Sequence, residues 1–137
     1  MMMLKPVDDG PAVVACNTCR HSPQAREDAS GMTAGARLVA ALHAAKAGSQ
    51  GYAAIAVQEM PCLFACSEPC AIHLRAPGKI GYVMGRFRPD AEAAKAILDY
   101  AVHYAASDHG QVPYGQWPEG VKGHFITRTP PPGYVAE

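Results

Sequence analysis

The chain has 137 residues, which is the length of one ordinary domain and enough to bury a single hydrophobic core. Its 12 basic and 12 acidic side chains balance, which argues against a nucleic-acid surface or a polybasic membrane patch. There is no apolar run of membrane-spanning length, and residues 1–9 lack the apolar stretch of a signal peptide. We therefore expect a cytoplasmic protein without a membrane segment, whose five cysteines stay reduced.

The first half of the chain predicts a strand, a helix and a second strand. A Val-rich apolar run predicts a buried strand that ends at Cys16, and a polar, irregular segment follows it. Thr33 is placed to cap a helix that Gly48 ends. The predicted elements are a strand over 12–15, a loop over 16–31, a helix over 34–47, a strand over 52–58 and a loop over 59–69.

The second half predicts a hairpin, a helix and an irregular tail. Pro77 and Gly78 suit the centre of a type II turn, and Asp90 opens the helix. The predicted elements are strands over 71–75 and 79–87 and a helix over 91–106. The order βαβ–ββα is typical of a thioredoxin-like α/β sandwich. We assign residues 1–106 to this metal-binding domain, and residues 107–137 to an extension rich in Pro, Gly and aromatic residues that packs on it.

The five cysteines gather in two clusters, each directly after a predicted strand. The first cluster is Cys16-Asn-Thr-Cys19, and the second is Cys62-Leu-Phe-Ala-Cys66-Ser-Glu-Pro-Cys70. In a parallel βαβ unit, both loops leave the same carboxyl edge of the sheet. We therefore expect the two clusters to be neighbours in space, although they are far apart in the sequence.

Thiolates are soft metal ligands, and four is the common number around a zinc ion or an iron–sulfur cluster. Two ligands from each of two loops would fix such a site, and backbone N–H groups in the loops can hydrogen-bond cluster sulfurs. Five thiols in two loops that meet are hard to explain as small buried residues alone. The spacing itself does not select the metal, because C-x2-C with C-x3-C is not the regular zinc-ribbon pattern.

The segment Cys62-Leu-Phe-Ala-Cys66, followed by a hairpin with Lys79-Ile-Gly-Tyr-Val, resembles the second cluster loop of thioredoxin-like [2Fe–2S] ferredoxins. The first strand that ends in a cysteine is similar as well. In that family two ligands come from the first loop and two from the second, and the first pair is usually more widely spaced than here. The resemblance implies a [2Fe–2S] cluster, with Cys70 as a substitute ligand. The implied ligands are Cys16, Cys19, Cys62 and Cys66.

The whole chain also resembles a family of bacterial proteins described as predicted metal-binding. The strings that carry this resemblance are Val14-Ala-Cys-Asn-Thr-Cys-Arg20, Ala65-Cys-Ser-Glu-Pro-Cys70, Gln111-Val-Pro-Tyr-Gly-Gln-Trp-Pro-Glu119 and His124-Phe-Ile-Thr-Arg-Thr-Pro130. Members of that family tend to be encoded near proteins of cobalamin synthesis and cobalt handling. The resemblance therefore implies a link to cobalamin or cobalt metabolism, by association alone.

Three functions remain open on these residues. The first is an electron carrier with an iron–sulfur cluster, which serves a redox partner protein and needs no substrate pocket. The second is a metal-binding protein without redox work, which uses a structural zinc or passes zinc or cobalt to an accepting protein. The third is a thiol oxidoreductase that uses Cys16 and Cys19, although a helix should then begin at once after the pair.

No catalytic triad order, phosphate-binding loop or carboxylate pair stands out, so the sequence does not predict an enzyme. His73 lies three residues after Cys70, but its place in a predicted strand favours a structural or exposed imidazole over a metal ligand. Related ferredoxins are often dimers, so the resemblance also implies a homodimer.

Overall fold

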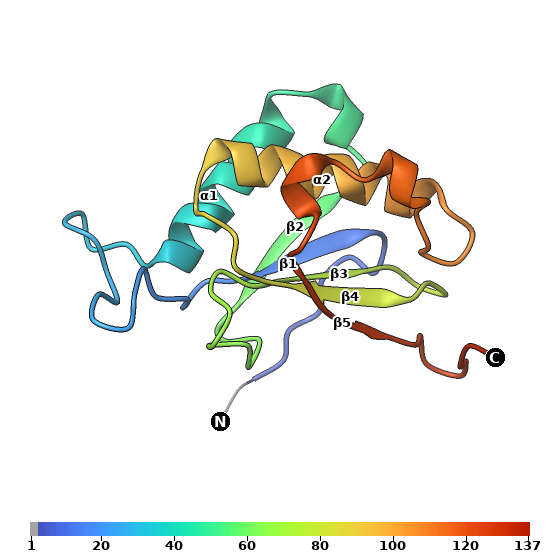
Figure 1. Ribbon diagram of the computed structural model, residues 1–137, viewed down its shortest axis with the longest axis horizontal. Coiled ribbons are helices and arrows are strands. Elements are labelled where there is room, and N and C mark those ends of the chain that lie inside the picture. The colour runs from blue at the N-terminus through green and yellow to red at the C-terminus, as the bar shows by residue number, and fades with distance from the viewer. Residues whose placement is uncertain (1–2) are drawn as a thin grey trace.

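The computed structural model describes residues 3–137, which contain five strands, two α-helices and three short 3-10 helices (Figure 1). In chain order they are β1 (Ala12–Cys16), α1 (Ala34–Ala47), η1 (Gln50–Tyr52), β2 (Ala56–Met60), β3 (Ile72–Arg75), β4 (Gly81–Met84), α2 (Ala91–Ala106), η2 (Tyr114–Gln116), η3 (Glu119–Val121) and β5 (Phe125–Thr129).

All five strands form one sheet in the order β2-β1-β3-β4-β5. Strands β1 and β2 are parallel, and the other neighbours are antiparallel. Both α-helices lie on the same side of the sheet (Figure 1). This is the βαβ–ββα sandwich that the sequence predicts. Within residues 3–137, no helix combines the length and the apolar character that crossing a bilayer requires.

The two α-helices begin and end at the predicted residues because their caps are local. The Thr33 side chain accepts a hydrogen bond from the Ala36 N–H at 3.0 Å, and the Asp90 carboxylate accepts one from Ala93 N–H at 2.9 Å. Each cap satisfies one of the N–H groups that the first helical turn leaves free. Gly48 ends α1 through hydrogen bonds from its N–H to carbonyls of the last turn.

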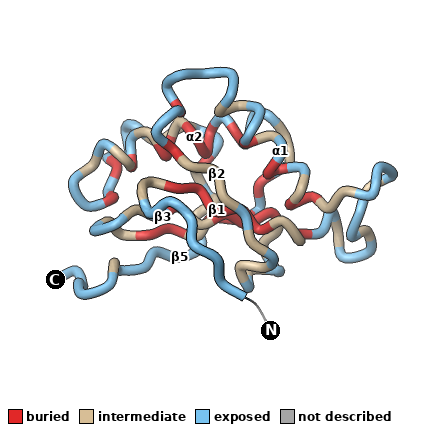
Figure 2. The backbone as a smooth tube through the Cα atoms, turned by 180° about the vertical axis from the view of Figure 1, so that it is seen from behind, coloured by how far each residue is buried: buried red, intermediate tan, exposed pale blue. Residues whose placement is uncertain are grey.

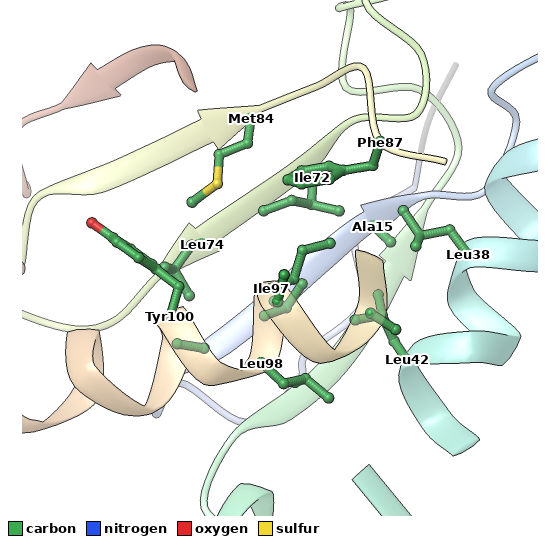
Figure 3. Packing of buried hydrophobic residues seen from close by; sticks show 14 of the residues in the cluster. Ala15, Leu38, Leu42, Ile72, Leu74, Met84, Phe87, Ile97, Leu98 and Tyr100 are labelled. Atoms are coloured by element: carbon green, nitrogen blue, oxygen red, sulfur yellow. The ribbon is translucent and has the colours of Figure 1, made fainter. Parts of the chain in front are cut away.

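The core lies between the helices and the sheet. Buried residues run along the whole of β1 and recur along β3, β4 and both α-helices (Figure 2). Leu38 and Leu42 of α1 meet Ile97 of α2 over the central strands (Figure 3). Every residue of β1 is buried, because this strand has the parallel β2 on one side and the antiparallel β3 on the other.

The strands differ from the sequence expectation in their bounds. Tyr52 lies in η1 rather than in a strand, and β2 begins at Ala56 and extends to Met60. The tail differs more, because Phe125–Thr129 forms β5 and pairs with β4, where irregular chain was expected. β5 is an edge strand whose residues are mostly exposed, so its sequence carries no alternation of apolar and polar residues.

Candidate metal centre

The two cysteine clusters meet at one edge of the sheet, as the parallel βαβ unit predicts. Cys16 is the last residue of β1 and pairs in register with Met60, the last residue of β2. Cys16, Cys19 and Cys66 line one small cavity of about 60 Å³. Cys70 reaches the same edge just before β3, and its backbone N–H and carbonyl pair with those of Phe87. All five cysteines are free thiols.

Burial divides these thiols into two groups. Cys16, Cys19 and Cys70 are buried, whereas Cys62 is half-buried and Cys66 is exposed. The sulfurs of Cys62 and Cys66 lie 3.9 Å apart. Two thiolates bound to one tetrahedral metal at about 2.3 Å stand roughly 3.8 Å apart, so this pair already has the spacing of two ligands on one metal ion.

The pKa values of the three buried thiols depend on one another, from Cys16 through Cys19 to Cys70. The Cys16 thiol has its pKa raised to about 12, by its hydrogen bond to Cys19 and by burial. Cys16 in turn lowers the pKa of Cys19, but contact with Cys70 and burial raise it on balance. The pKa of Cys70 is lowered, because the Cys19 thiol hydrogen-bonds to it. Among the buried thiols, negative charge is therefore favoured at Cys70.

The position of α1 argues against a thioredoxin-type redox pair. Such a pair needs a nucleophilic thiol with a depressed pKa, usually supplied by a helix that starts at the cysteine. Here the pKa of Cys16 is raised, and α1 begins only at Ala34. Binding a metal ion would instead displace the thiol protons, because thiolates are the ligand form.

Backbone N–H groups favour the thiolate form of several cysteines. Those of Thr18 and Leu63 lower the pKa of Cys16, and that of Ala71 lowers the pKa of Cys19, against the larger effects that raise both pKa values. The Phe64 N–H donates to the Cys62 sulfur, with 3.3 Å between nitrogen and sulfur. Amide donors of this kind stabilise charge on ligating sulfur and tune a bound metal centre.

The N-terminus of α1 holds the first cysteine loop in place. The Gly35 N–H donates to the Cys19 carbonyl over 3.1 Å, and the Thr33 hydroxyl donates to the Asn17 carbonyl over 2.6 Å. A Cβ on Gly35 would lie 2.1 Å from the Cys16 carbonyl oxygen, so only glycine permits this approach. The sequence indicates Thr33 as a helix cap, but nothing in it indicates this second bond or the role of Gly35.

Asp28 organises the rest of the first loop, a role that the sequence did not predict. Its carboxylate accepts hydrogen bonds from the Ser30 N–H at 2.9 Å and the Met32 N–H at 3.2 Å, and it pairs with Arg37 of α1. The Ser30 hydroxyl and the Arg37 guanidinium hold the pKa of Asp28 well below its usual range. The Asp-x-Ser spacing is typical of an Asx turn, which is the signal that could have found it.

The second loop presents an aromatic side chain to solvent. Phe64 lies between Cys62 and Cys66 and is 96% exposed. Cys62 and Phe64 have φ of 65° and 61°, in the left-handed region that bulky residues rarely adopt. Glu68 of this loop pairs with Arg86 across 3.0 Å, which ties the loop to the chain after β4.

His73, Arg75 and His21 take no part in the thiol cluster. His73 is half-buried in β3 and has its pKa lowered by burial, while Arg75 hydrogen-bonds Gln58. His21 contacts the Met32 carbonyl. Among residues 3–137, no three His, Cys, Asp or Glu side chains converge as a ready-made site for a single ion.

A family model described as "Protein of unknown function (DUF1636)" matches residues 13–131. The chain belongs to this family. No curated protein matches it. A solved structure of a thioredoxin-like [2Fe–2S] ferredoxin from Aquifex aeolicus is similar, with 16% sequence identity and a TM-score of 0.56, over 93% of this chain and all 100% of that one.

A second structure, of the wild-type Aquifex aeolicus thioredoxin-like [2Fe–2S] ferredoxin, is 16% identical with a TM-score of 0.54, over 88% of this chain and 99% of that one. At this identity the likeness shows the fold alone. It confirms the thioredoxin-like sandwich that the order of predicted elements indicates.

Proposed function

We propose that this protein is an electron carrier that holds an iron–sulfur cluster, of the [2Fe–2S] type. The cluster lies at the thiol edge, which is the edge of the sheet after β1 and β2 where the five cysteines gather. The observation that supports this is the gathering of five free thiols from two loops around the ends of β1 and β2. The likeness in fold to thioredoxin-like [2Fe–2S] ferredoxins supports the same choice.

The donor set fits a two-iron cluster better than a single ion. A [2Fe–2S] cluster takes four cysteine thiolates, two on each iron. Cys62 and Cys66 form one pair with 3.9 Å between sulfurs, and Cys16 and Cys19, which line the same small cavity, form the second pair. We assign these four as ligands and Cys70, in contact with Cys19, as the substitute ligand. When bound, the cluster would supply one-electron redox chemistry.

Other residues of the two cysteine loops would stabilise the cluster and form the surface that a redox partner contacts. The amides of Thr18, Leu63 and Phe64 would hydrogen-bond the ligating sulfurs. Exposed Cys66 and Phe64 mark the side from which a redox partner protein would approach. The cytoplasm, a reducing compartment, would keep the thiols free for metal.

The test is to purify the protein under nitrogen, record its visible absorption, and assay iron, zinc, cobalt and acid-labile sulfide. We expect a brown protein that bleaches with dithionite and contains iron and sulfide in equal amounts, about two of each per chain. Single Cys→Ser variants at all five positions then assign the ligands. Each ligand variant should lose or shift the visible spectrum, and the non-ligand variant should keep it. A colourless protein with zinc would refute the proposal.

A metal-transfer protein is the second candidate, and the exposure of Cys66 favours it. An exposed thiol beside a second thiol 3.9 Å away can pass a soft metal ion to the thiols of an accepting protein by ligand exchange. Cobalt belongs in the assay because the resemblance to the predicted metal-binding family carries an association with cobalamin. Colourless protein with about one zinc per chain would select this candidate.

A further inference from the structure

A second cavity lies away from the thiol edge, beside β4 and β5. Its volume is about 360 Å³, which is within the range of small-molecule pockets. Four aromatic rings line it and pack edge to face or tilted against one another, with centroids 4.7 to 5.9 Å apart. These rings belong to Tyr82, Tyr100, Trp117 and Phe125.

Two buried tyrosines of this cavity have hydroxyls without a protein partner. Tyr82 is 8% exposed and Tyr100 is 1% exposed, and no group within residues 3–137 hydrogen-bonds either hydroxyl. The Tyr100 hydroxyl points away from Ile97 and Leu98 (Figure 3). Tyr82 is the more exposed of the two residues, so its hydroxyl is the one left to bond a molecule in the cavity.

Arg128 adds a positive charge to the same cavity. It pairs in register with Tyr82 across β4 and β5, so both side chains leave the sheet on the same face. Arg128 is exposed, and it makes none of the ion pairs found among residues 3–137. An arginine on an aromatic wall, with the Tyr82 hydroxyl nearby, suits a flat ring that carries one carboxylate.

We propose that the cavity between β4, β5 and the chain around Trp117, which follows α2, binds a planar aromatic carboxylate. The ring lies against the half-buried Trp117 and Phe125, and Arg128 binds the carboxylate together with the Tyr82 hydroxyl. This site is independent of the thiol edge, which lies after β1 and β2. It gives the protein a small-molecule ligand in addition to any metal.

The probe is 2-naphthoate, with neutral 2-naphthamide as its isostere, titrated calorimetrically into the full chain. We expect the acid to bind at least about tenfold more tightly than the amide, which is the size of one charge-assisted hydrogen bond. Arg128→Gln should weaken the acid about tenfold and leave the amide unchanged. Arg88→Gln, an exposed arginine outside the cavity, is the matched control and should bind the acid like the wild type.

The location is checked with the only tryptophan of the chain. Trp117 donates its indole N–H to the Val112 carbonyl, so its NMR signal should shift when the ring enters. Tyr82→Phe should weaken the acid several-fold without changing the urea midpoint, because the lost hydroxyl bonds nothing among residues 3–137. The proposal is overturned if acid and amide bind equally, if Arg128→Gln matches Arg88→Gln, or if millimolar 2-naphthoate leaves the Trp117 signal in place.

Discussion

Replacing Gly35 by Ala tests how tightly α1 is held against the first cysteine loop. The added Cβ would lie 2.1 Å from the Cys16 carbonyl oxygen and 2.9 Å from the Cys19 backbone nitrogen. A relaxed contact between carbon and carbonyl oxygen is about 3.3 Å, so the helix and the loop must separate by roughly 1.2 Å. Both neighbours are backbone atoms, and no side-chain rotation can relieve the clash.

Two opposing effects set the size of the change. Ala is a better helix former than Gly by about 1 kcal/mol, which would stabilise α1. Forcing an extra methyl group into packed chain costs about 1–3 kcal/mol, occasionally more. The shift also stretches the hydrogen bond from the Gly35 N–H to the Cys19 carbonyl, now 3.1 Å. We expect steric cost to win, with a net loss of about 1–2 kcal/mol in the free energy of unfolding.

The assay is urea unfolding of the metal-free protein, followed by iron and sulfide content after reconstitution. Gly35→Ala should lower the free energy of unfolding and also the iron and sulfide content, because the displaced loop carries Cys16 and Cys19. Gly115→Ala is the matched control: a Cβ there meets nothing within 4 Å. If Gly35→Ala unfolds at the same urea concentration as the wild type and binds the same iron, then the close approach of α1 to the loop is not what fixes these cysteines.

Three further predictions concern the same loops. Thr33→Ala removes both the α1 cap and the hydrogen bond to Asn17, so the free energy of unfolding in urea should fall by about 1–2 kcal/mol, whereas Thr33→Ser should keep most of it. Asp28 has a pKa well below its usual range, because Ser30 and Arg37 bind its carboxylate. Its contribution is present above the unfolded pKa of about 3.9 and is lost as the pH falls through the folded value. The wild type should therefore lose more urea stability than Asp28→Asn between about pH 5 and about pH 2, and equal losses would contradict this. Phe64→Ala should leave the visible spectrum and stability unchanged, because the ring is 96% exposed, yet slow reduction by a ferredoxin reductase several-fold; an unchanged rate would remove Phe64 from the partner surface.

Much of the candidate site follows from the sequence through topology. Once β1, α1 and β2 are recognised as a parallel βαβ unit, their carboxyl ends must share an edge, and both cysteine clusters must meet there. The sequence does not reveal which thiols are buried. Cys70 contacts Cys19 because its backbone pairs with Phe87 beyond β4, whereas Cys66, in the loop before it, is exposed.

The sequence alone determined both α-helices and the hairpin turn, because their signals are local. Thr33 and Asp90 cap helices within three residues of themselves, and Gly78 adopts the positive φ of 73° that a type II turn requires. Only the tertiary structure decided that Phe125–Thr129 is a strand and that Gly35 meets the Cys16 carbonyl. Both depend on a partner distant in the chain: β5 exists because β4 offers an open edge, and Gly35 matters because α1 crosses the end of β1. Contacts of this kind leave no periodic pattern in the sequence, since they arise from packing rather than from the preferences of neighbouring residues.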